Sequence, residues 1–380
     1  MKKKVLIDIT WTLPGHGVHG NYVSGIGQST MAYLDKLNSY DDLPFDVELY
    51  ASTSRAKQCE FNRWNYKHHT LPIPSKITNQ GWRIEAYLRN FLYKADLFHV
   101  TGNYADVTAK EPFIATINDC IELDKINPNN MTRSEGLLKD RLNRMAKFSR
   151  YVVTISRFSK SEILRYFDIN PDKILVNYCG IDRSRFRCMS SGEIEAVIMK
   201  HGIRQPYFFS CSCSHPRKNL DTALLAFREF LTSHHEHIFV AAWGNPTQAI
   251  LKEFSSEILS GKIVFLPFLT DEEIVALYNG ASMSVYVSRK EGFGMPILES
   301  FACETPIMTC RNSSLQEVGQ DAAIYVGEDN IDEMVDVMKM FESNSYNMDT
   351  FKARSKKVLD QFTWENTAKR YLEIYYKSLE

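Results

Sequence analysis

Short apolar runs alternate with longer amphipathic segments along the whole chain, and this alternation constrains the fold more than any other feature. Such a pattern predicts parallel β-strands joined by helices. The pattern restarts after residues 186–204, and 380 residues are more than one hydrophobic core usually supports. We therefore predict an α/β fold in which two Rossmann-like, doubly wound domains face a central cleft.

The expected elements form two arrays. In the first, the strands are Lys4–Ile9, Phe45–Ala51, Leu97–Val100, Phe113–Ile117, Tyr151–Ile155 and Ile174–Asn177, and the helices are Gln28–Leu37, Trp82–Lys94 and Ser134–Arg150. In the second, the strands are Tyr207–Cys213, His237–Trp243, Ile263–Leu266 and Met283–Val287, and the helices are Leu220–Thr232, Glu272–Asn279 with Asp271 as its N-cap, and Ile297–Cys303. Ligands of such sheets bind beyond the carboxyl ends of the strands, so site residues are expected in the loops that follow strands.

Composition and charge exclude several classes of protein. Hydrophobic residues make up 44% of the chain and charged residues 24%, which excludes disordered and fibrous proteins. The net charge of −1 gives no indication of nucleic-acid binding. Residues 1–185 carry 26 Lys and Arg against 20 Asp and Glu, whereas residues 186–380 carry 19 against 26. Either the basic half meets an anionic partner or surface, or the two halves differ by drift.

The eight cysteines lack the spacing of a zinc site and indicate a reducing compartment. The apolar run Val5–Ile7 is too short for a signal peptide, and no run approaches the roughly 20 residues that span a bilayer. We expect a cytoplasmic protein, with peripheral contact on the inner face of the membrane as an open alternative. The segment Trp82–Lys94 is amphipathic, aromatic and basic, as suits an anionic membrane surface. Otherwise it is an ordinary helix that packs its apolar face on the sheet.

The segment with the clearest chemistry spans residues 288–300, between an expected strand and an expected helix. Gly292 and Gly294 let backbone amides approach a ligand closely, and the helix N-terminus favours an anion such as a diphosphate. Glu291 and Glu299 can each accept hydrogen bonds from sugar hydroxyls on opposite sides of a bound phosphate. The spacing of the two glutamates by itself also fits an ordinary strand–loop–helix with two surface carboxylates.

A second loop carries two adjacent cations, Arg217 and Lys218, between an expected strand and a helix that Asn219 is expected to cap. The guanidinium offers a bidentate fork and the ammonium a point charge, which together suit a phosphate. Cations at a helix N-terminus oppose the helix dipole, and a bound anion would supply the reason for their placement. The alternative is a solvated basic pair.

Together these segments resemble the retaining glycosyltransferases of family 4, the mannosyltransferase-like group 1 enzymes, which have the GT-B fold. The resemblance covers nearly the whole chain. The motifs that carry it are Gly25-Ile-Gly27, Thr116-Ile-Asn118-Asp119, Thr154-Ile-Ser156-Arg-Phe-Ser159, Asn177-Tyr-Cys-Gly180-Ile-Asp182, Pro216-Arg-Lys-Asn219, Phe268-Leu-Thr-Asp-Glu-Glu273, Glu291 to Glu299, Ala302-Cys-Glu-Thr-Pro306 and Phe362-Thr-Trp364-Glu365.

The resemblance implies a role for each matching residue. Glu299 would hold the ribose, Glu291 the donor sugar, and Arg217 with Lys218 the diphosphate leaving group. The implied catalytic residues are Glu291, Asn118, Arg217 and Lys218. The implied donor-binding residues are Gly25, Gly27, Arg217, Lys218, Glu291, Gly292, Phe293, Gly294, Met295, Pro296, Leu298 and Glu299.

The resemblance also implies a different ligand for each domain. Residues 1–186 would bind the acceptor, and residues 187–363 would bind the donor. The final helix, 364–380, would return to the N-terminal domain. The implied reaction moves a hexose, with retention, from GDP-mannose or a UDP-sugar to a hydroxyl of a saccharide or lipid-linked acceptor. Its setting would be bacterial surface polysaccharide or lipopolysaccharide biosynthesis.

Two features qualify this interpretation. The family commonly has His where Asn118 stands, and an amide cannot titrate near neutrality. The chain has no Asp-x-Asp motif, so we expect no metal and no cofactor. Three alternatives stay open: a dinucleotide-binding enzyme, for which Gly25-x-Gly27 lacks a third glycine; a non-catalytic sugar-nucleotide sensor; and an epimerase or phosphorylase on the same fold.

Overall fold

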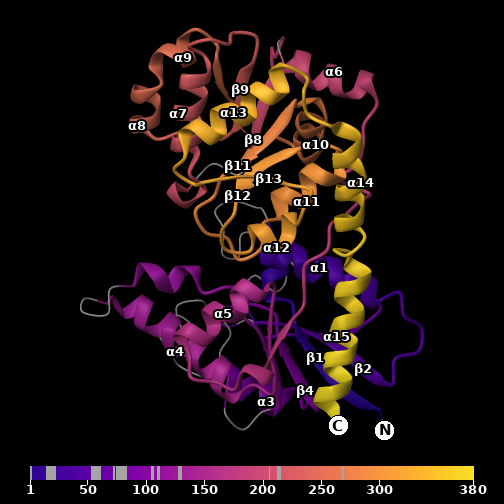
Figure 1. The fold of residues 1–380 in the computed structure, drawn as a ribbon. Coiled ribbons are helices and arrows are strands. Elements are labelled where there is room, and N and C mark those ends of the chain that lie inside the picture. The colour runs from indigo at the N-terminus through magenta and orange to yellow at the C-terminus, as the bar shows by residue number, and fades with distance from the viewer. Residues whose placement is uncertain are drawn as a thin grey trace. The chain divides into compact units, whose positions relative to one another are not determined.

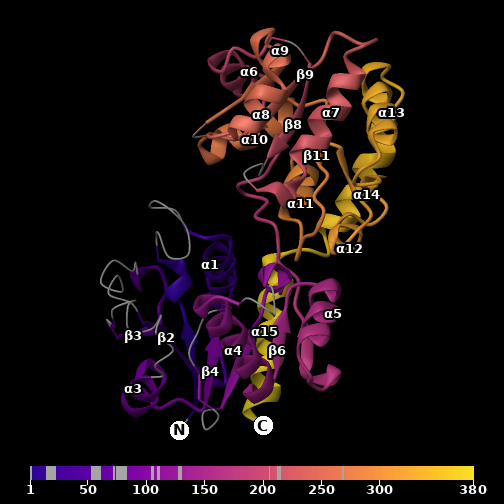
Figure 2. The same ribbon diagram turned by 90° about the vertical axis from the view of Figure 1, so that its left-hand side faces the viewer.

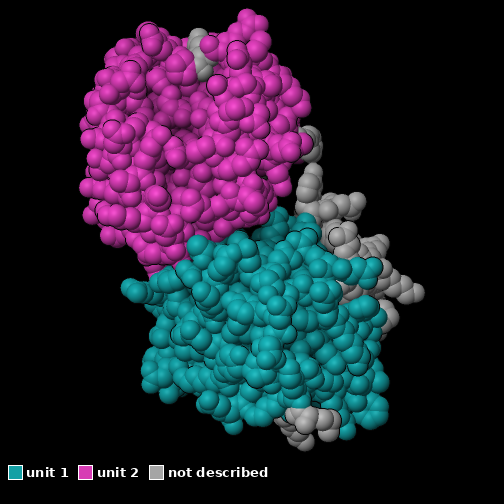
Figure 3. Space-filling model, turned by 90° about the vertical axis from the view of Figure 1, so that its right-hand side faces the viewer, with its two compact units in different colours: residues 1–180, 363–380 teal, residues 181–362 magenta. Residues whose placement is uncertain are grey.

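The computed structural model describes residues 2–13, 23–52, 61–71, 73, 84–103, 107–108, 112–126, 131–204, 206–211, 215–267 and 269–380. It divides into two compact units (Figures 1 and 3): residues 1–180 with 363–380 are unit 1, and residues 181–362 are unit 2. The division falls after Gly180 rather than after residue 186. The Ile181 amide donates to the Phe362 carbonyl (3.0 Å), so the chain enters and leaves unit 2 at adjacent points.

The described residues of unit 1 form a seven-stranded parallel sheet in the order β3-β2-β1-β4-β5-β6-β7. Its strands are β1 (Lys3–Asp8), β2 (Phe45–Ala51), β3 (Lys67–Thr70), β4 (Leu97–Val100), β5 (Phe113–Thr116), β6 (Val152–Thr154) and β7 (Ile174–Val176). Its helices are α1 (Gly25–Leu37), α3 (Ile84–Leu92), α4 (Arg133–Phe148), α5 (Arg157–Tyr166) and α15 (Trp364–Leu379). The strand order reverses direction between β1 and β4, as in doubly wound folds.

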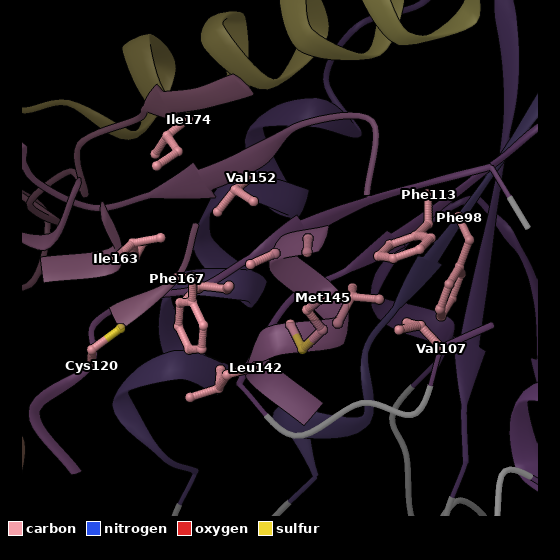
Figure 4. Packing of buried hydrophobic residues seen from close by; sticks show 14 of the residues in the cluster. Phe98, Val107, Phe113, Cys120, Leu142, Met145, Val152, Ile163, Phe167 and Ile174 are labelled. Carbon is pink, nitrogen blue, oxygen red and sulfur yellow. The ribbon is translucent and has the colours of Figure 1, made fainter. Parts of the chain in front are cut away.

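Helices cover both faces of this sheet. Figure 4 shows the apolar cluster on one face, to which Phe98 of β4, Leu142 of α4 and Ile163 of α5 belong. His99, the next residue along β4, points to the opposite face and shares a hydrogen bond with the Tyr375 hydroxyl of α15 (2.7 Å). Side chains alternate across a strand, so β4 itself separates the two layers.

A glycine lets the start of the final helix approach the backbone of unit 1 closely. A Cβ atom on Gly180 would lie 2.2 Å from the backbone nitrogen of Trp364, at the start of α15. Thr363 caps that helix, because its side chain accepts from the Asn366 amide (3.1 Å). The Asn177 side chain also donates to the Thr367 carbonyl (3.1 Å), so α15 is anchored where β7 ends.

The described residues of unit 2 form a six-stranded parallel sheet in the order β10-β9-β8-β11-β12-β13, again reversing direction at its first strand. Its strands are β8 (Tyr207–Cys211), β9 (Ile238–Ala242), β10 (Ile263–Phe265), β11 (Met283–Tyr286), β12 (Ile307–Cys310) and β13 (Ile324–Val326). Its helices are α6 (Ser191–Lys200), α7 (Leu220–Phe230), α8 (Gln248–Glu253), α9 (Ser255–Leu259), α10 (Asp271–Gly280), α11 (Met295–Ala302), α12 (Leu315–Gly319), α13 (Ile331–Glu342) and α14 (Met348–Leu359).

One helix cap was predicted at the wrong residue, and another lacks its expected side-chain bond. Thr270, not Asp271, caps α10: its side chain accepts from the Glu273 amide (3.2 Å), and the Glu273 carboxylate accepts from the Thr270 amide (2.7 Å). This reciprocal pair satisfies two helix donors and makes Asp271 the first helical residue. Asn219 precedes α7 as expected, but its side chain caps nothing and donates instead to the Val287 carbonyl (3.1 Å).

Helix α3 is not an ordinary helix that packs its apolar face on the sheet. Its buried residues are Glu85, Ala86 and Arg89, whereas its large apolar side chains face outward. Glu85 and Arg89 form an ion pair against the sheet (2.8 Å). The apolar face of this helix therefore does not pack on the sheet.

Candidate functional site

Two loops meet at the carboxyl ends of β8 and β11 in unit 2, where the strand order reverses (Figure 1). The Arg217 carbonyl accepts from the Arg289 amide (2.9 Å), and its oxygen lies 3.0 Å from the Ser288 hydroxyl. The Asn219 side chain joins the same two loops through the Val287 carbonyl. Ligands of doubly wound sheets bind at such a reversal, so this is the candidate site of unit 2.

The Glu291 carboxylate is the centre of this site. Arg217 approaches one of its oxygens at 2.6 Å, and Lys218 approaches the other at 2.8 Å. The Ser288 hydroxyl donates to the oxygen that Lys218 contacts (2.6 Å). Glu291 is buried, with 7% of its surface exposed, so these pairs act in a medium of lower dielectric than water. The two loops are thus joined by a carboxylate between two cations.

The charge state of Glu291 follows from these neighbours. Burial by itself raises the pKa of Glu291, but Lys218 and Arg217 together hold it below its ordinary value. The carboxylate is therefore ionised at neutral pH. Because Glu291 already supplies a counter-charge, the placement of the two cations does not require a bound anion, contrary to the expectation from the helix dipole.

The backbone of the 287–294 loop is held by two serines that the sequence analysis missed. The Ser313 hydroxyl accepts from the Glu291 amide (3.0 Å). The Ser314 hydroxyl lies 2.8 Å from the Glu291 carbonyl and 2.7 Å from the Phe293 carbonyl. Both serines precede α12, more than twenty positions along the chain, and no motif in the sequence marks them.

Gly294 turns the loop into α11. Its φ of 112° lies in the left-handed region, where L-residues with side chains are strained. A Cβ atom there would also lie 3.0 Å from Leu315. Pro296 occupies the first turn of α11, where its missing N–H leaves no bond unmade. The loop therefore leads directly into a helix N-terminus, which favours an anion.

Glu299 lies inside α11 and differs from Glu291 in its surroundings. Its carboxylate accepts from the Tyr278 hydroxyl of α10 (3.1 Å). Burial raises the pKa of Glu299 to about 7, although Tyr278 and Arg185 act in the opposite direction. Glu291 and Glu299, eight positions apart, thus have opposite pKa shifts. The pKa of Glu291 is lowered, whereas that of Glu299 is raised to about 7.

The remaining predicted donor residues differ in how far they are buried. Gly292 and Phe293 are buried in the loop, and the Phe293 ring packs edge-on against Phe362 (5.8 Å). Met295 and Pro296 are half-buried at the start of α11. Leu298 is fully buried in the core, so its side chain has a packing role. The described residues contain no group of three His, Cys, Asp or Glu that could hold a metal ion.

Asn118 follows β5 at the carboxyl edge of the unit 1 sheet. Its amide donates to the Asn103 side chain (3.1 Å), and its carbonyl accepts from the Thr154 hydroxyl (3.2 Å). Its side-chain nitrogen Nδ2 is buried and has no hydrogen-bond partner among the residues that the structure describes. Buried polar groups are rarely left without a partner, so this donor has capacity for a ligand.

Gly25 and Gly27, which were expected in the loop before the first helix, lie in the first turn of α1. Ser24 caps α1 by accepting from the Gly27 amide (3.2 Å). A Cβ atom on Gly27 would lie 2.1 Å from the Trp11 carbonyl, so close packing explains this glycine. Gly25 is exposed with open space beside it. The preceding loop, with His16 and His19, lies outside the described residues.

Comparison with known proteins covers both units. A family model described as Glycosyltransferase Family 4 matches residues 25–185, and one described as Glycosyl transferases group 1 matches residues 194–358. No helix among the described residues is both long and apolar enough to cross a membrane.

Two curated relatives and one solved structure illustrate the similarity. The O-antigen chain mannosyltransferase B of Escherichia coli is 24% identical over 303 residues, which cover 78% of this chain and 76% of the relative. The serotype-specific mannosyltransferase WbdA of Escherichia coli is 24% identical over 375 residues, 96% of this chain but only 45% of the relative. The crystal structure of Anabaena HepE with UDP-glucose superimposes with a TM-score of 0.72 at 14% identity, covering 98% of this chain and 99% of HepE.

Proposed function

The chain is a GT-B glycosyltransferase of family 4, built from the family 4 and group 1 domains, and from this premise we propose that it transfers a hexose from a nucleotide-diphosphate sugar to a saccharide hydroxyl. GDP-mannose is the favoured donor, because the relatives are named as O-antigen and serotype-specific mannosyltransferases. A UDP-hexose is the alternative, since HepE is seen with UDP-glucose. The setting is bacterial surface polysaccharide biosynthesis.

The observation that carries this proposal is the carboxylate held between two cations. A donor diphosphate brings oxygens that compete with Glu291 for Arg217 and Lys218. As the cations turn to the diphosphate, Glu291 is left with acceptor capacity beside the sugar. The two cations thus exchange an internal partner for a ligand, and the Glu291 carboxylate keeps the hydrogen bond from the Ser288 hydroxyl.

The proposed reaction exchanges one bond at the anomeric carbon for another. The bond from the anomeric carbon to the diphosphate oxygen breaks, and a bond from the acceptor oxygen forms on the same face. The acceptor proton passes to the leaving oxygen, which yields a nucleoside diphosphate and a glycoside. Arg217 and Lys218 stabilise the charge on the leaving group, and Glu291 stabilises positive charge on the ring. We propose that this chemistry needs no metal.

The other roles follow the family positions. Glu299 accepts from the donor ribose, and the amides of the 292–294 loop face the diphosphate. In unit 1, the unpaired Nδ2 of Asn118 donates to a sugar oxygen of donor or acceptor. We place the reaction in the cytoplasm, with the acceptor either free or linked to a lipid at the inner face of the membrane.

A donor screen tests this function. The melting temperature is measured with GDP, UDP and ADP, with their hexose conjugates, and with EDTA added. A ligand at ~100 times its Kd adds about 2.7 kcal/mol of stability, which shifts the melting temperature measurably. Transfer is then followed by mass spectrometry with the best donor and saccharide acceptors. Stabilisation by no nucleoside diphosphate, or binding without transfer or donor hydrolysis, would reject the enzymatic function.

A further inference from the structure

Helix α3 presents a continuous apolar stripe to the surface of unit 1. Its large apolar side chains recur at positions i, i+3, i+4, i+7 and i+8, and all are exposed: Ile84 (39%), Tyr87 (62%), Leu88 (39%), Phe91 (79%) and Leu92 (51%). This spacing places them on one face of the helix. In Figures 1 and 2, α3 lies at the periphery of unit 1. Contiguous exposed stripes of this kind mark interaction surfaces.

The inward face of α3 is polar. Arg89 donates two hydrogen bonds to Glu85 (2.8 and 3.0 Å), and its guanidinium lies 3.8 Å from the centre of the Phe98 ring. The Tyr50 hydroxyl also donates to Glu85. Removing two charges from water costs free energy that burial of apolar side chains would not. The helix therefore keeps its apolar side chains outside at an energetic disadvantage, which calls for a partner that covers them.

The charges around the stripe identify the chemistry of that partner. Glu85 is the only acidic residue of α3, and it is buried in its ion pair, so the exposed face carries no negative charge. Lys94 follows the helix and is exposed. Residues 107–108 bridge α3 to α4, because Asn90 donates to the Thr108 hydroxyl (3.4 Å) and Arg144 donates to the Val107 carbonyl.

Helix α4 is basic and packs on the same side of the sheet, where its Leu142 belongs to the cluster that contains Phe98. Its Arg133, Lys139 and Lys147 are exposed, whereas Arg141 and Arg144 are half-buried. It carries five basic residues against two acidic ones, namely Arg133, Lys139, Arg141, Arg144 and Lys147 against Glu135 and Asp140. An apolar stripe beside an excess of cations complements an anionic lipid surface, which offers hydrocarbon and negative headgroups together. A second copy of the chain fits less well, because a two-fold contact would bring the two basic surfaces together.

We propose that α3 is an interfacial helix that docks unit 1 on an anionic bilayer. Its apolar stripe enters the boundary between headgroups and acyl chains, and the basic residues of α4 contact the headgroups. This inference depends on the proposed function only for its biological purpose, namely access to a lipid-linked acceptor. The docking surface itself lies in unit 1, whereas the donor residues lie in unit 2.

Flotation with lipid vesicles tests the proposal on the full chain. Vesicles of phosphatidylcholine, with and without phosphatidylglycerol, are mixed with the wild type and with Leu88→Ser/Phe91→Ser. We expect the double variant to lose at least about tenfold in partitioning, because each side chain loses apolar area that would be buried. Lys139→Glu/Lys147→Glu should lose about tenfold on the anionic vesicles alone, and added salt should weaken wild-type binding.

Leu259→Ser is the matched control, because Leu259 is the most exposed large apolar residue among the described residues of unit 2 (88%) and is far from α3 in sequence. It should float like the wild type. The proposal is overturned if the wild type binds neither vesicle, or if Leu88→Ser/Phe91→Ser binds as strongly as the wild type. It is also overturned if that variant converts a dimer to a monomer without any change in vesicle binding.

The same variants separate this proposal from the proposed function. Leu88→Ser/Phe91→Ser should keep the wild-type melting temperature and the same stabilisation by nucleoside diphosphate. If vesicle binding depends on α3 but no nucleoside diphosphate stabilises the chain, the docking proposal stands and the donor proposal fails. If donors bind and vesicles do not, the reverse holds.

Discussion

The carboxyl edges of the two sheets are organised differently. In unit 2, both oxygens of Glu291 are paired with cations, and serines hold the backbone on either side. In unit 1, Asn118 keeps its backbone bonds but leaves Nδ2 without a partner among the described residues. A preorganised charge cluster suits an anionic ligand such as a diphosphate. An unpaired hydrogen-bond donor suits a neutral ligand, such as a sugar hydroxyl.

The largest expected effect tests the preorganised edge. Glu291→Gln keeps the shape of the side chain and removes its charge. Turnover should fall about 10²–10³-fold, because a preorganised group beside the developing charge is lost. Nucleoside-diphosphate affinity should hold or increase, because Arg217 and Lys218 lose their internal competitor. Steady-state kinetics and calorimetry with the diphosphate measure the two quantities.

If the affinity for nucleoside diphosphate falls together with turnover, Glu291 does not compete with the ligand for the cations. Glu195→Gln is the control for this variant, since Glu195 is an exposed glutamate of α6 in the same unit. It should leave both quantities unchanged.

Removing the cations should have the next largest effect. Arg217→Ala/Lys218→Ala should weaken nucleoside-diphosphate binding about a hundredfold or more, since bonds to charged groups contribute roughly 1.5–3 kcal/mol each. The pKa of Glu291 should rise as well, because burial then acts unopposed. Lys356→Ala/Lys357→Ala, an adjacent exposed pair on α14, is the matched control. Activity that disappears in EDTA and returns with Mg²⁺ would contradict the metal-free reaction.

A pH series distinguishes Glu299 from Glu291. Since the pKa of Glu299 is raised to about 7, a growing fraction of this carboxyl is protonated as the pH falls from 8 to 6. A protonated carboxyl accepts fewer hydrogen bonds from ribose, so the donor KM should rise over that interval. Glu299→Gln should raise the donor KM roughly tenfold to a hundredfold at pH 8 and remove the pH dependence.

The same shift has a consequence for stability with a definite sign. The folded pKa of Glu299 lies above its unfolded value, so the folded state holds the proton more tightly. The contribution of Glu299 to stability therefore decreases as the pH rises from about 4.5 towards 7 and is lost above 7. Thermal unfolding of Glu299→Gln should show a smaller decrease over that interval. An identical pH dependence in both proteins would mean that the pKa is not raised.

The smallest effect belongs to unit 1. Asn118→Ala removes a donor that has no partner among the described residues, so the melting temperature should stay the same while transfer falls up to about tenfold. Asn118→His should be tolerated. Asn103→Ala is the informative contrast, because Asn103 accepts from the Asn118 amide and donates to the Asp119 carbonyl. It should lose about 1–2 kcal/mol of stability. Transfer by Asn118→Ala at the wild-type rate would make the position structural only.

Most strands of the fold can be predicted from the amino-acid sequence. Period-two and helical patterns arise from neighbouring residues, so the alternation predicted two parallel sheets, with most strand ends within two residues of those observed. β3, β12 and β13 were not predicted, and β3 is only four residues long at a sheet edge. The topology rule then placed Glu291, Arg217 and Lys218 at the carboxyl ends of strands, where the structure has them.

The pairing of these residues, in contrast, is visible only in three dimensions. Glu291 lies 74 positions from Arg217 and 73 from Lys218, so no local pattern reveals that they neutralise one another. The same holds for the opposite pKa shifts of Glu291 and Glu299, which depend on what surrounds each carboxylate. Periodicity also showed that α3 is amphipathic but not which face it buries, because that depends on Tyr50 and Phe98 from distant strands. Local periodicity is a property of neighbours along the chain, whereas charge, pairing and burial are set by neighbours in space.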